Sequence, residues 1–250
     1  MSAETLLDVR GLGKRFGGFA AVDGVNLAVA PGTIHSVIGP NGAGKTTFFR
    51  LLTGILRPTS GSVTFEARDI TGLRLHAVTR RGLTQSFQIT NVFPRLSVLE
   101  SVQVAVLARR RRSWDCVSLH HRTVRSEALV LLSQVGLSEH AHAEAQTLSH
   151  GDQRILEVAL ALATHPRLLL LDEPTAGMSP FETDRMVELI TELARERGLT
   201  VLLSEHDMDV VFGISDHVTV LHQGQVIADG SPNEVQDDEQ VIEVYLGGEA

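Results

Sequence analysis

The sequence predicts an α/β fold in which a mostly parallel sheet is covered by helices on both faces. Three features of the 250 residues lead to this prediction. Fully apolar strands alternate with helices along the last hundred residues, which is typical of parallel sheets. A glycine-rich loop at residues 39–47 joins a predicted strand to a predicted helix. The middle of the chain, residues 90–151, reads as helical, so we expect a helical insertion in an α/β core.

The first ninety residues are predicted to form short strands and one helix. A β-branched strand at residues 33–38 ends at Gly39, and a helix follows from residue 45 to about residue 53, where Gly54 stops it. The other strands expected in this part cover residues 6–10, 25–29, 62–65 and 84–87.

The helical middle is predicted from apolar residues at helical spacing. Ser97, with Glu100 three residues later, forms a capping box that opens a helix at residues 97–108, and the same spacing returns at residues 123–135. Four arginines at residues 109–112 lie between these two helices. We interpret them as a solvated helix end that complements the helix dipole, with contact to anionic lipid head groups as the alternative.

The last hundred residues alternate between helices and strands. The expected helices cover residues 152–163, 181–197 and 208–213. The expected strands cover residues 168–171, 200–204, 218–221 and 226–228. Open α/β sheets bind ligands outside the carboxyl ends of their strands, so residues that follow these strands are candidates for a site.

The composition excludes several classes of protein. The chain has 22 Lys+Arg against 30 Asp+Glu, so we expect no nucleic-acid partner, because an acidic chain repels phosphate unless basic residues cluster. An apolar fraction of 43% excludes disorder. The single cysteine, Cys116, cannot form an internal disulfide. The sequence contains neither a signal-peptide pattern nor a run of about 18 apolar residues, so we expect a cytoplasmic protein.

The strongest chemical signal is the loop at residues 39–47, Gly-Pro-Asn-Gly-Ala-Gly-Lys-Thr-Thr, which matches the pattern G-x-x-x-x-G-K-[ST]. Its glycines let backbone N–H groups converge on a phosphate, and the following helix adds its positive dipole end. Lys45, one of only two lysines in the chain, is expected to neutralise the β- and γ-phosphates, while the Thr46 hydroxyl holds Mg²⁺. The predicted nucleotide-binding residues of this loop are Gly39, Asn41, Gly42, Ala43, Gly44, Lys45, Thr46 and Thr47.

Further candidates for hydrolysis follow three of the predicted strands. After the strand at residues 168–171, Asp172 is expected to support Mg²⁺ through its water shell and Glu173 to polarise an attacking water. Gln88 follows the strand at residues 84–87 and is a candidate to ligate Mg²⁺ and sense the γ-phosphate. His206 follows the strand at residues 200–204 and is a candidate to contact the γ-phosphate and the attacking water.

Phe16 precedes two glycines and is a candidate to stack on adenine through its π face. A place in the apolar core is an equally good interpretation of an isolated phenylalanine.

Taken in order, these motifs resemble those of ABC-transporter ATPases. The resemblance covers essentially the whole chain, and its most specific part is the signature at residues 148–153, Leu-Ser-His-Gly-Asp-Gln. It implies a RecA-like mixed-sheet core at residues 1–89 and 152–250, with an N-terminal antiparallel β subdomain, and a helical signature subdomain at residues 90–151. In that family Ser149 and Gly151 bind the γ-phosphate held by the opposite subunit, which suits the free N–H groups at a helix start.

Three positions depart from the commonest family pattern. His150 replaces the usual second glycine of the signature, and Asp152 replaces a glutamine or glutamate. Ser179 stands where an aspartate often bridges the two subunits, so the roles of Ser179 and His150 stay open. A histidine at the place of His150 recurs in importers of the branched-chain amino acid and urea type.

Four segments, at residues 16–22, 87–94, 173–180 and 204–208, are similar to the ATP-binding subunits of branched-chain amino acid importers. This resemblance implies ATP and Mg²⁺ as cofactors and ATP hydrolysis that drives uptake through membrane permease subunits. It also implies a second ATPase subunit, identical or paralogous, an indirect link to a solute-binding protein, and a place on the inner face of the membrane. The alternatives are a urea or amide importer and another ABC system such as a lipid exporter.

Overall fold

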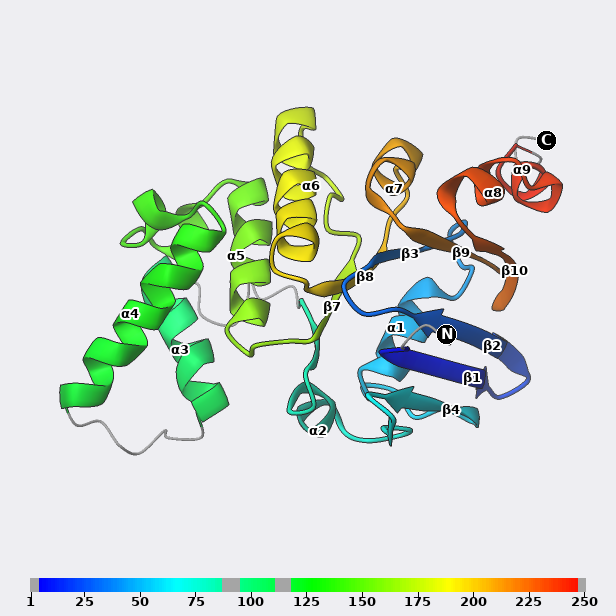
Figure 1. The fold of residues 1–250 in the computed structure, drawn as a ribbon, viewed down its shortest axis with the longest axis horizontal. Coiled ribbons are helices and arrows are strands. Elements are labelled where there is room, and N and C mark those ends of the chain that lie inside the picture. Colours follow the sequence, from blue (N-terminus) through cyan, green and yellow to red (C-terminus); the bar gives the residue numbers. More distant parts are fainter. Residues whose placement is uncertain (1–4, 87–94, 111–117, 247–250) are drawn as a thin grey trace.

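Two sheets organise the part of the chain that the computed structural model describes, which is residues 5–86, 95–110 and 118–246 (Figure 1). The larger sheet has six strands in the order β10-β9-β3-β8-β7-β6. Its pairs are parallel except for the hairpin of β9 and β10. The strands are β3 (Ile34–Ile38), β6 (Leu83–Gln85), β7 (Leu168–Asp172), β8 (Thr200–Ser204), β9 (His217–His222) and β10 (Gln225–Gly230).

The central strands are apolar on both faces because both faces are covered. In β7, Leu169 and Leu171 join a core with α5 (His150–Leu162) and α6 (Pro180–Arg195). Leu168 and Leu170 point to the other side, into a core with α1 (Lys45–Leu52) and the second sheet. The prediction of a parallel sheet buried on both faces is therefore confirmed.

The second sheet is antiparallel, with the order β2-β1-β4-β5. It consists of β1 (Leu7–Phe16), β2 (Phe19–Val29), β4 (Ser60–Phe65) and β5 (Arg68–Asp69). The strands expected at residues 6–10 and 25–29 were too short. Register shifts follow Val9, Leu12 and Lys14 in β1. Such bulges break the alternation of apolar and polar residues from which strands are predicted.

The region predicted to be a helical subdomain, residues 90–151, contains α3 (Val98–Arg110) and α4 (Ser118–Gln134), and α5 begins at its end. The predicted capping box is confirmed, because the backbone N–H and hydroxyl of Ser97 both donate to Glu100 at 2.8 Å. Arg109 and Arg110 end α3, as expected, and both form ion pairs with Glu127 of α4. Residues 111 and 112 lie outside the described residues.

Several short elements were not predicted from the sequence. They are α2 (Leu75–Thr79), α8 (Pro232–Gln236), α9 (Glu239–Leu246) and two 3₁₀ turns at Ser138–His140 and Ala145–Thr147. The helix α7 (Met208–Ile214) was expected. Among the described residues no helix is both long and apolar enough to cross a membrane.

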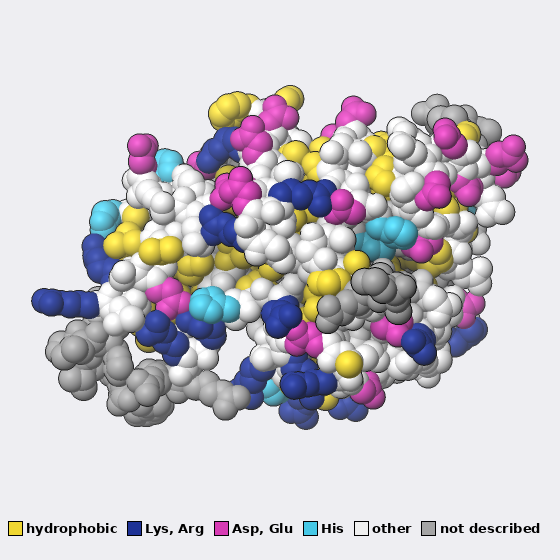
Figure 2. Space-filling view, in the orientation of Figure 1, with side chains coloured by type: hydrophobic (Ala, Val, Ile, Leu, Met, Phe, Trp, Pro, Cys, Tyr) yellow, Lys and Arg dark blue, Asp and Glu magenta, His cyan; other side chains and the backbone are white. Residues whose placement is uncertain are grey.

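Charge is unevenly distributed over the molecule. Acidic side chains gather around α8 and α9 on the face shown in Figure 2. The sequence explains this, because no Lys or Arg follows Arg197 in the chain. The whole excess of acidic residues therefore belongs to the C-terminal part, which lies away from α3 and α4 (Figure 1).

Candidate nucleotide-binding site

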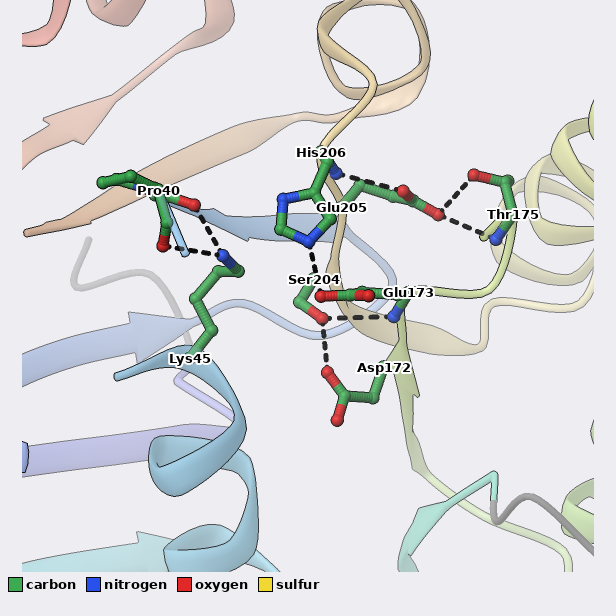
Figure 3. Close-up of polar contacts among 9 residues, drawn as sticks. Pro40, Lys45, Asp172, Glu173, Thr175, Ser204, Glu205 and His206 are labelled. Atoms are coloured by element: carbon green, nitrogen blue, oxygen red, sulfur yellow. Dashed lines mark hydrogen bonds and ion pairs between the residues drawn. The ribbon is translucent and has the colours of Figure 1, made fainter. Parts of the chain in front are cut away.

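The carboxyl ends of β3, β8 and β7 lie side by side, since these strands are parallel neighbours. The loops that follow them carry the glycine-rich segment, His206 and the acidic pair (Figure 3). The sheet thus gathers Lys45, Glu173 and His206 at one edge, where an open α/β sheet binds its ligand.

The loop that follows β3 needs glycine at two positions for steric reasons. Gly39 has φ +150°, and a Cβ atom there would lie 2.1 Å from the carbonyl oxygen of Leu221. Gly44 has φ +106°, and a Cβ atom there would lie 2.5 Å from the carbonyl oxygen of Ala21. Both positions exclude any larger residue, and Gly44 is the N-cap of α1. The loop therefore presents backbone rather than side chains at the start of that helix, which suits an anion.

Lys45 bends back over its own loop. Its Nζ donates to the carbonyl oxygens of Gly39 at 2.5 Å and Pro40 at 3.2 Å (Figure 3). Burial lowers the pKa of Lys45, and the charges of Glu173 and Asp172 oppose that shift. The side chain is 6% exposed, so its ammonium is a nearly desolvated donor with two weak acceptors. Such a donor is suited to exchange neutral carbonyls for phosphate oxygens.

The acidic pair at the end of β7 is held by β8. The hydroxyl of Ser204 donates to Asp172 Oδ1 at 2.6 Å, and the backbone N–H of Glu173 donates to the carbonyl oxygen of Ser204 at 3.0 Å. Glu173 has φ +51°, a left-handed conformation that costs on the order of 1 kcal/mol in a residue with a side chain. Strain of this kind is common at functional sites, where it directs a side chain that the regular strand would aim elsewhere.

His206 lies beside Glu173. Its Nε2 is 2.5 Å from Glu173 Oε1, and the two side chains are 42% and 35% exposed (Figure 3). An imidazole at this distance can orient the carboxylate and exchange a proton with it. The structure therefore brings together two of the three predicted catalytic residues, while Gln88 lies outside the described residues.

Glu205 is a residue of this edge that our sequence reasoning missed. Its Oε1 accepts from the backbone N–H of Thr175 at 2.9 Å and from the Thr175 hydroxyl at 2.7 Å. Its Oε2 accepts from the backbone N–H of His206 at 3.1 Å. Glu205 is 2% exposed, so this carboxylate ties the loop after β7 to the loop after β8. An acid directly after an apolar strand was the available signal, as it was for Asp172.

The signature residues form a second cluster, at the start of α5. Ser149 is the N-cap, and its hydroxyl accepts from the backbone N–H of Asp152 at 3.1 Å. The backbone N–H of Gly151 donates to Glu182 Oε1 at 3.0 Å. Ser179 is the N-cap of α6, so it has a structural role in the free subunit. Among the described residues, the contacts of this cluster run to α6 rather than to the glycine-rich loop.

Phe16 lies at the end of β1 and is 49% exposed, so the interpretation as a core residue is wrong. The Lys14 ammonium lies 5.2 Å from the centroid of the ring. Thr46 is exposed in the first turn of α1, and Thr47 beside it is half-buried.

Comparison with known proteins decides the family. A family model described as ABC transporter matches residues 22–176, which is more than half of the chain. The chain belongs to the ABC transporter family of ATP-binding cassettes. A model described as a branched-chain amino acid ATP-binding cassette transporter matches residues 225–250 of this cassette.

Two relatives match the cassette over nearly their whole length. It is 42% identical to the high-affinity branched-chain amino acid transport ATP-binding protein BraF of Pseudomonas aeruginosa, over 97% of this chain and 98% of the relative. It is also 42% identical to LivG of Escherichia coli, a protein with the same description, over 98% and 99%.

The fold matches solved cassettes. The crystal structure of the ADP conformation of MJ1267, an ATP-binding cassette of an ABC transporter, is similar with a TM-score of 0.88 and 30% identity, over 98% of this chain and 99% of that one. A dimeric structure of MJ0796, a bacterial ABC transporter cassette, is similar with a TM-score of 0.77 and 26% identity, over 90% and 98%. The expected ABC ATPase fold is confirmed, and the chain is an ATPase whose family works with membrane permeases.

Proposed function

We propose that this cassette hydrolyses ATP to drive the uptake of branched-chain amino acids through partner permease subunits. The observation that carries the ATPase part is the sheet edge that holds both Lys45 and the Glu173–His206 pair (Figure 3). The branched-chain amino acid part is supported by BraF and LivG, at 42% identity, and by the family model over residues 225–250.

The residues of the edge have separate tasks in this proposal. The backbone of residues 39–47 and the Lys45 ammonium bind the phosphates of ATP, and Phe16 stacks on the adenine. Glu173 takes a proton from the attacking water, and His206 orients the Glu173 carboxylate and contacts the γ-phosphate together with Gln88.

Oxygen ligands at this edge fit Mg²⁺. The Thr46 hydroxyl is exposed at the start of α1, and Asp172 is held by Ser204 so that its carboxylate stays at the end of β7. Mg²⁺ prefers such hard oxygen donors and keeps several waters. Thr46 and Gln88 would ligate the ion and Asp172 would support its water shell, and Mg²⁺ held there would supply positive charge against the phosphates.

The working unit is proposed to be two ATPase subunits related by a twofold axis. Each ATP site then combines Lys45 of one subunit with Ser149 and Gly151 of the other. The dimeric cassette among the similar structures supports this arrangement. The pair is proposed to sit on the inner face of the cell membrane, bound to the permeases and linked through them to a solute-binding protein.

A mixing experiment tests the proposed dimer. Lys45→Ala and Ser149→Arg subunits are each expected to be inactive alone, because every site of either homodimer lacks one essential group. In the mixed dimer one site is doubly damaged and the other is intact, so ATPase activity should return on mixing. Full activity of Ser149→Arg alone would contradict the proposed role of the signature, and native mass spectrometry confirms that mixed dimers form.

The solute is tested in the assembled transporter. The cassette, purified with its permeases in lipid vesicles, should show ATPase activity that rises with leucine, isoleucine or valine and the solute-binding protein. Stimulation by urea or an amide instead would identify the alternative importer class, and stimulation by a lipid would identify an exporter.

A further inference from the structure

A carboxylate of the chain itself lies at the start of the signature helix. Gly151 is the second residue of α5, so its backbone N–H has no acceptor within the helix. Glu182 of α6 provides that acceptor, with Oε1 at 3.0 Å from the Gly151 nitrogen. The positive end of the helix dipole favours a negative charge at this place.

The contact between the two residues is close. A Cβ atom added to Gly151 would lie 2.6 Å from Glu182 Oε1 and 2.7 Å from Glu182 Cγ. A larger residue at position 151 would therefore push the Glu182 side chain aside and weaken its hydrogen bond to the backbone of α5.

The second oxygen of the same carboxylate caps α6. Glu182 Oε2 accepts from the Ser179 backbone N–H at 3.0 Å and from the Ser179 hydroxyl at 2.8 Å. These hydrogen bonds from Ser179, together with the one from the Gly151 backbone, lower the pKa of Glu182 to about 2. The carboxylate is therefore charged at neutral pH and joins the starts of α5 and α6.

We propose that Glu182 is an internal competitor for the partner's nucleotide, which must displace its carboxylate from the Gly151 N–H before two subunits close on ATP. The inference rests on the proposed function, in which Gly151 and Ser149 bind the γ-phosphate held by the partner. One N–H cannot serve two anions at once, and a carboxylate beside an incoming phosphate repels it. Glu182 thereby raises the ATP concentration at which the subunits associate.

The displacement is local. Glu182 is half-buried, so its side chain reaches water and Oε1 can turn outward when it leaves Gly151. Oε2 has its own partners in Ser179, so release of Gly151 does not require the loss of the α6 cap.

The chain contains a matched control for this contact. Ser231 and Glu234 form a capping box at the start of α8, in which the Ser231 backbone N–H and hydroxyl both donate to Glu234 Oε2 at 2.8 Å. The return bond from the Glu234 backbone N–H to the Ser231 hydroxyl is 3.4 Å, as is its equivalent in the Ser179 box. The two boxes differ because Glu182 also accepts from the Gly151 backbone and hydrogen-bonds with the Ser149 side chain in the signature segment.

The test measures association of the full chain in a Glu173→Gln background, where hydrolysis is suppressed. Sedimentation velocity gives the fraction of dimer as Mg-ATP is added. Glu182→Gln should lower the ATP concentration for half-maximal dimer by about five- to tenfold, since a neutral amide holds the N–H less strongly than a carboxylate. Glu234→Gln removes the same charge from the α8 box and should leave that concentration unchanged.

A second variant, Glu182→Asp, separates the effect of the negative charge from the effect of side-chain length. Glu182→Asp keeps the charge and the capping position but is one methylene shorter, so it should release Gly151 and shift dimerisation in the same direction as Glu182→Gln. Thermal unfolding checks that each variant is folded, and Glu182→Asp provides the comparison if Glu182→Gln is not.

The outcomes are distinguishable. An ATP concentration that is unchanged or raised in both Glu182 variants, with dimerisation intact, overturns the proposal and leaves the proposed function in place. A Glu173→Gln parent that does not dimerise with ATP at any concentration overturns the proposed function, and the competitor role with it.

Discussion

Both ends of the parallel sheet carry histidine and carboxylate side chains, but at the amino end one of the histidines is buried. At the carboxyl end, Glu173 and His206 are close together and both are more than one-third exposed. At the amino end, β3 and β9 place His35 and His217 opposite each other, with ring centroids 4.8 Å apart. His35 is 1% exposed, and its Nε2 is 2.7 Å from the Thr219 hydroxyl, which in turn donates to Asp229.

The polar groups of the amino end satisfy one another. His35 donates to Thr219, Thr219 donates to one oxygen of Asp229, and His217 pairs with the other at 3.2 Å. Buried polar groups that are fully hydrogen-bonded hold strands in register and keep them rigid. The carboxyl end instead presents half-exposed groups and a lysine whose acceptors are neutral carbonyls. We infer that the amino end stabilises the sheet and that the carboxyl end recognises the ligand.

Among variants at the two ends of the sheet, Glu173→Gln is expected to have the largest effect, on the rate of ATP hydrolysis. The variant should bind ATP but hydrolyse it at least ~10²-fold more slowly, because the amide cannot take a proton from water. Steady-state kcat and nucleotide affinity measure the two properties. Asp229→Asn, the same change at the amino end, should leave kcat nearly unaltered. Near-normal turnover of Glu173→Gln would remove Glu173 from the role of base.

Phe16→Ala should weaken nucleotide binding by about 1–3 kcal/mol if the ring stacks on adenine. Phe19 pairs with Phe16 in the β1–β2 register and is 65% exposed, so Phe19→Ala is the matched control for a lost aromatic ring on this hairpin. Calorimetric titration with an ATP analogue measures both affinities. A Phe16→Ala affinity equal to that of the wild type would mean that Phe16 does not stack on the base.

His35 should make the protein less stable as the pH falls. Burial and the neighbouring His217 lower the pKa of His35 to about 3, from 6.5 for the free side chain. Between these two pKa values His35 is protonated in the unfolded chain but not in the folded one. The free energy of unfolding therefore decreases as the pH falls below 6.5. Between pH 7 and pH 5 this contributes about 2 kcal/mol to the free energy of unfolding.

Urea unfolding of the wild type and of His35→Leu at both pH values measures that contribution. The leucine variant should lose less stability between pH 7 and pH 5 than the wild type, with ATP binding unchanged. Identical pH dependence in the two proteins would show that His35 is not the titrating group.

The smallest effect is expected for the pH dependence of stability that arises from His217, which has the opposite sign to that from His35. The hydrogen bond to Asp229 raises the pKa of His217 above its ordinary value. A raised pKa means that the folded state holds the proton more tightly, so this stabilisation is lost as the pH rises through the folded-state pKa. The pair is partly exposed, so the effect should stay below about 1 kcal/mol. Urea unfolding of His35→Leu between pH 6 and pH 8 should show it, because the opposite pH dependence of His35 is then removed, and Asp229→Asn in the same background should abolish it.

Most residues of the proposed nucleotide site, at the carboxyl edge of the larger sheet, could be predicted from the sequence because they lie in short local motifs. The loop at residues 39–47 follows a β-branched strand directly, and Asp172 and Glu173 follow four leucines. A strand without a polar face must be covered on both sides, so the residues at its end are brought to the ligand edge whatever the exact topology. The fold class and the positions of Lys45, Glu173 and His206 were available in this way.

Only the tertiary structure decided which side chains meet across the chain. Glu182 lies 31 residues from Gly151, and Thr219 lies 184 residues from His35, so no local pattern links either pair. The same holds for Glu205, whose partner Thr175 belongs to the loop of another strand. Strand register and helix packing set these contacts, and a shift by one residue would turn each side chain to the other face. Local sequence therefore determines which chemical groups lie at the carboxyl edge of the larger sheet. The contacts that hold or restrain those groups depend on how the helices and strands pack.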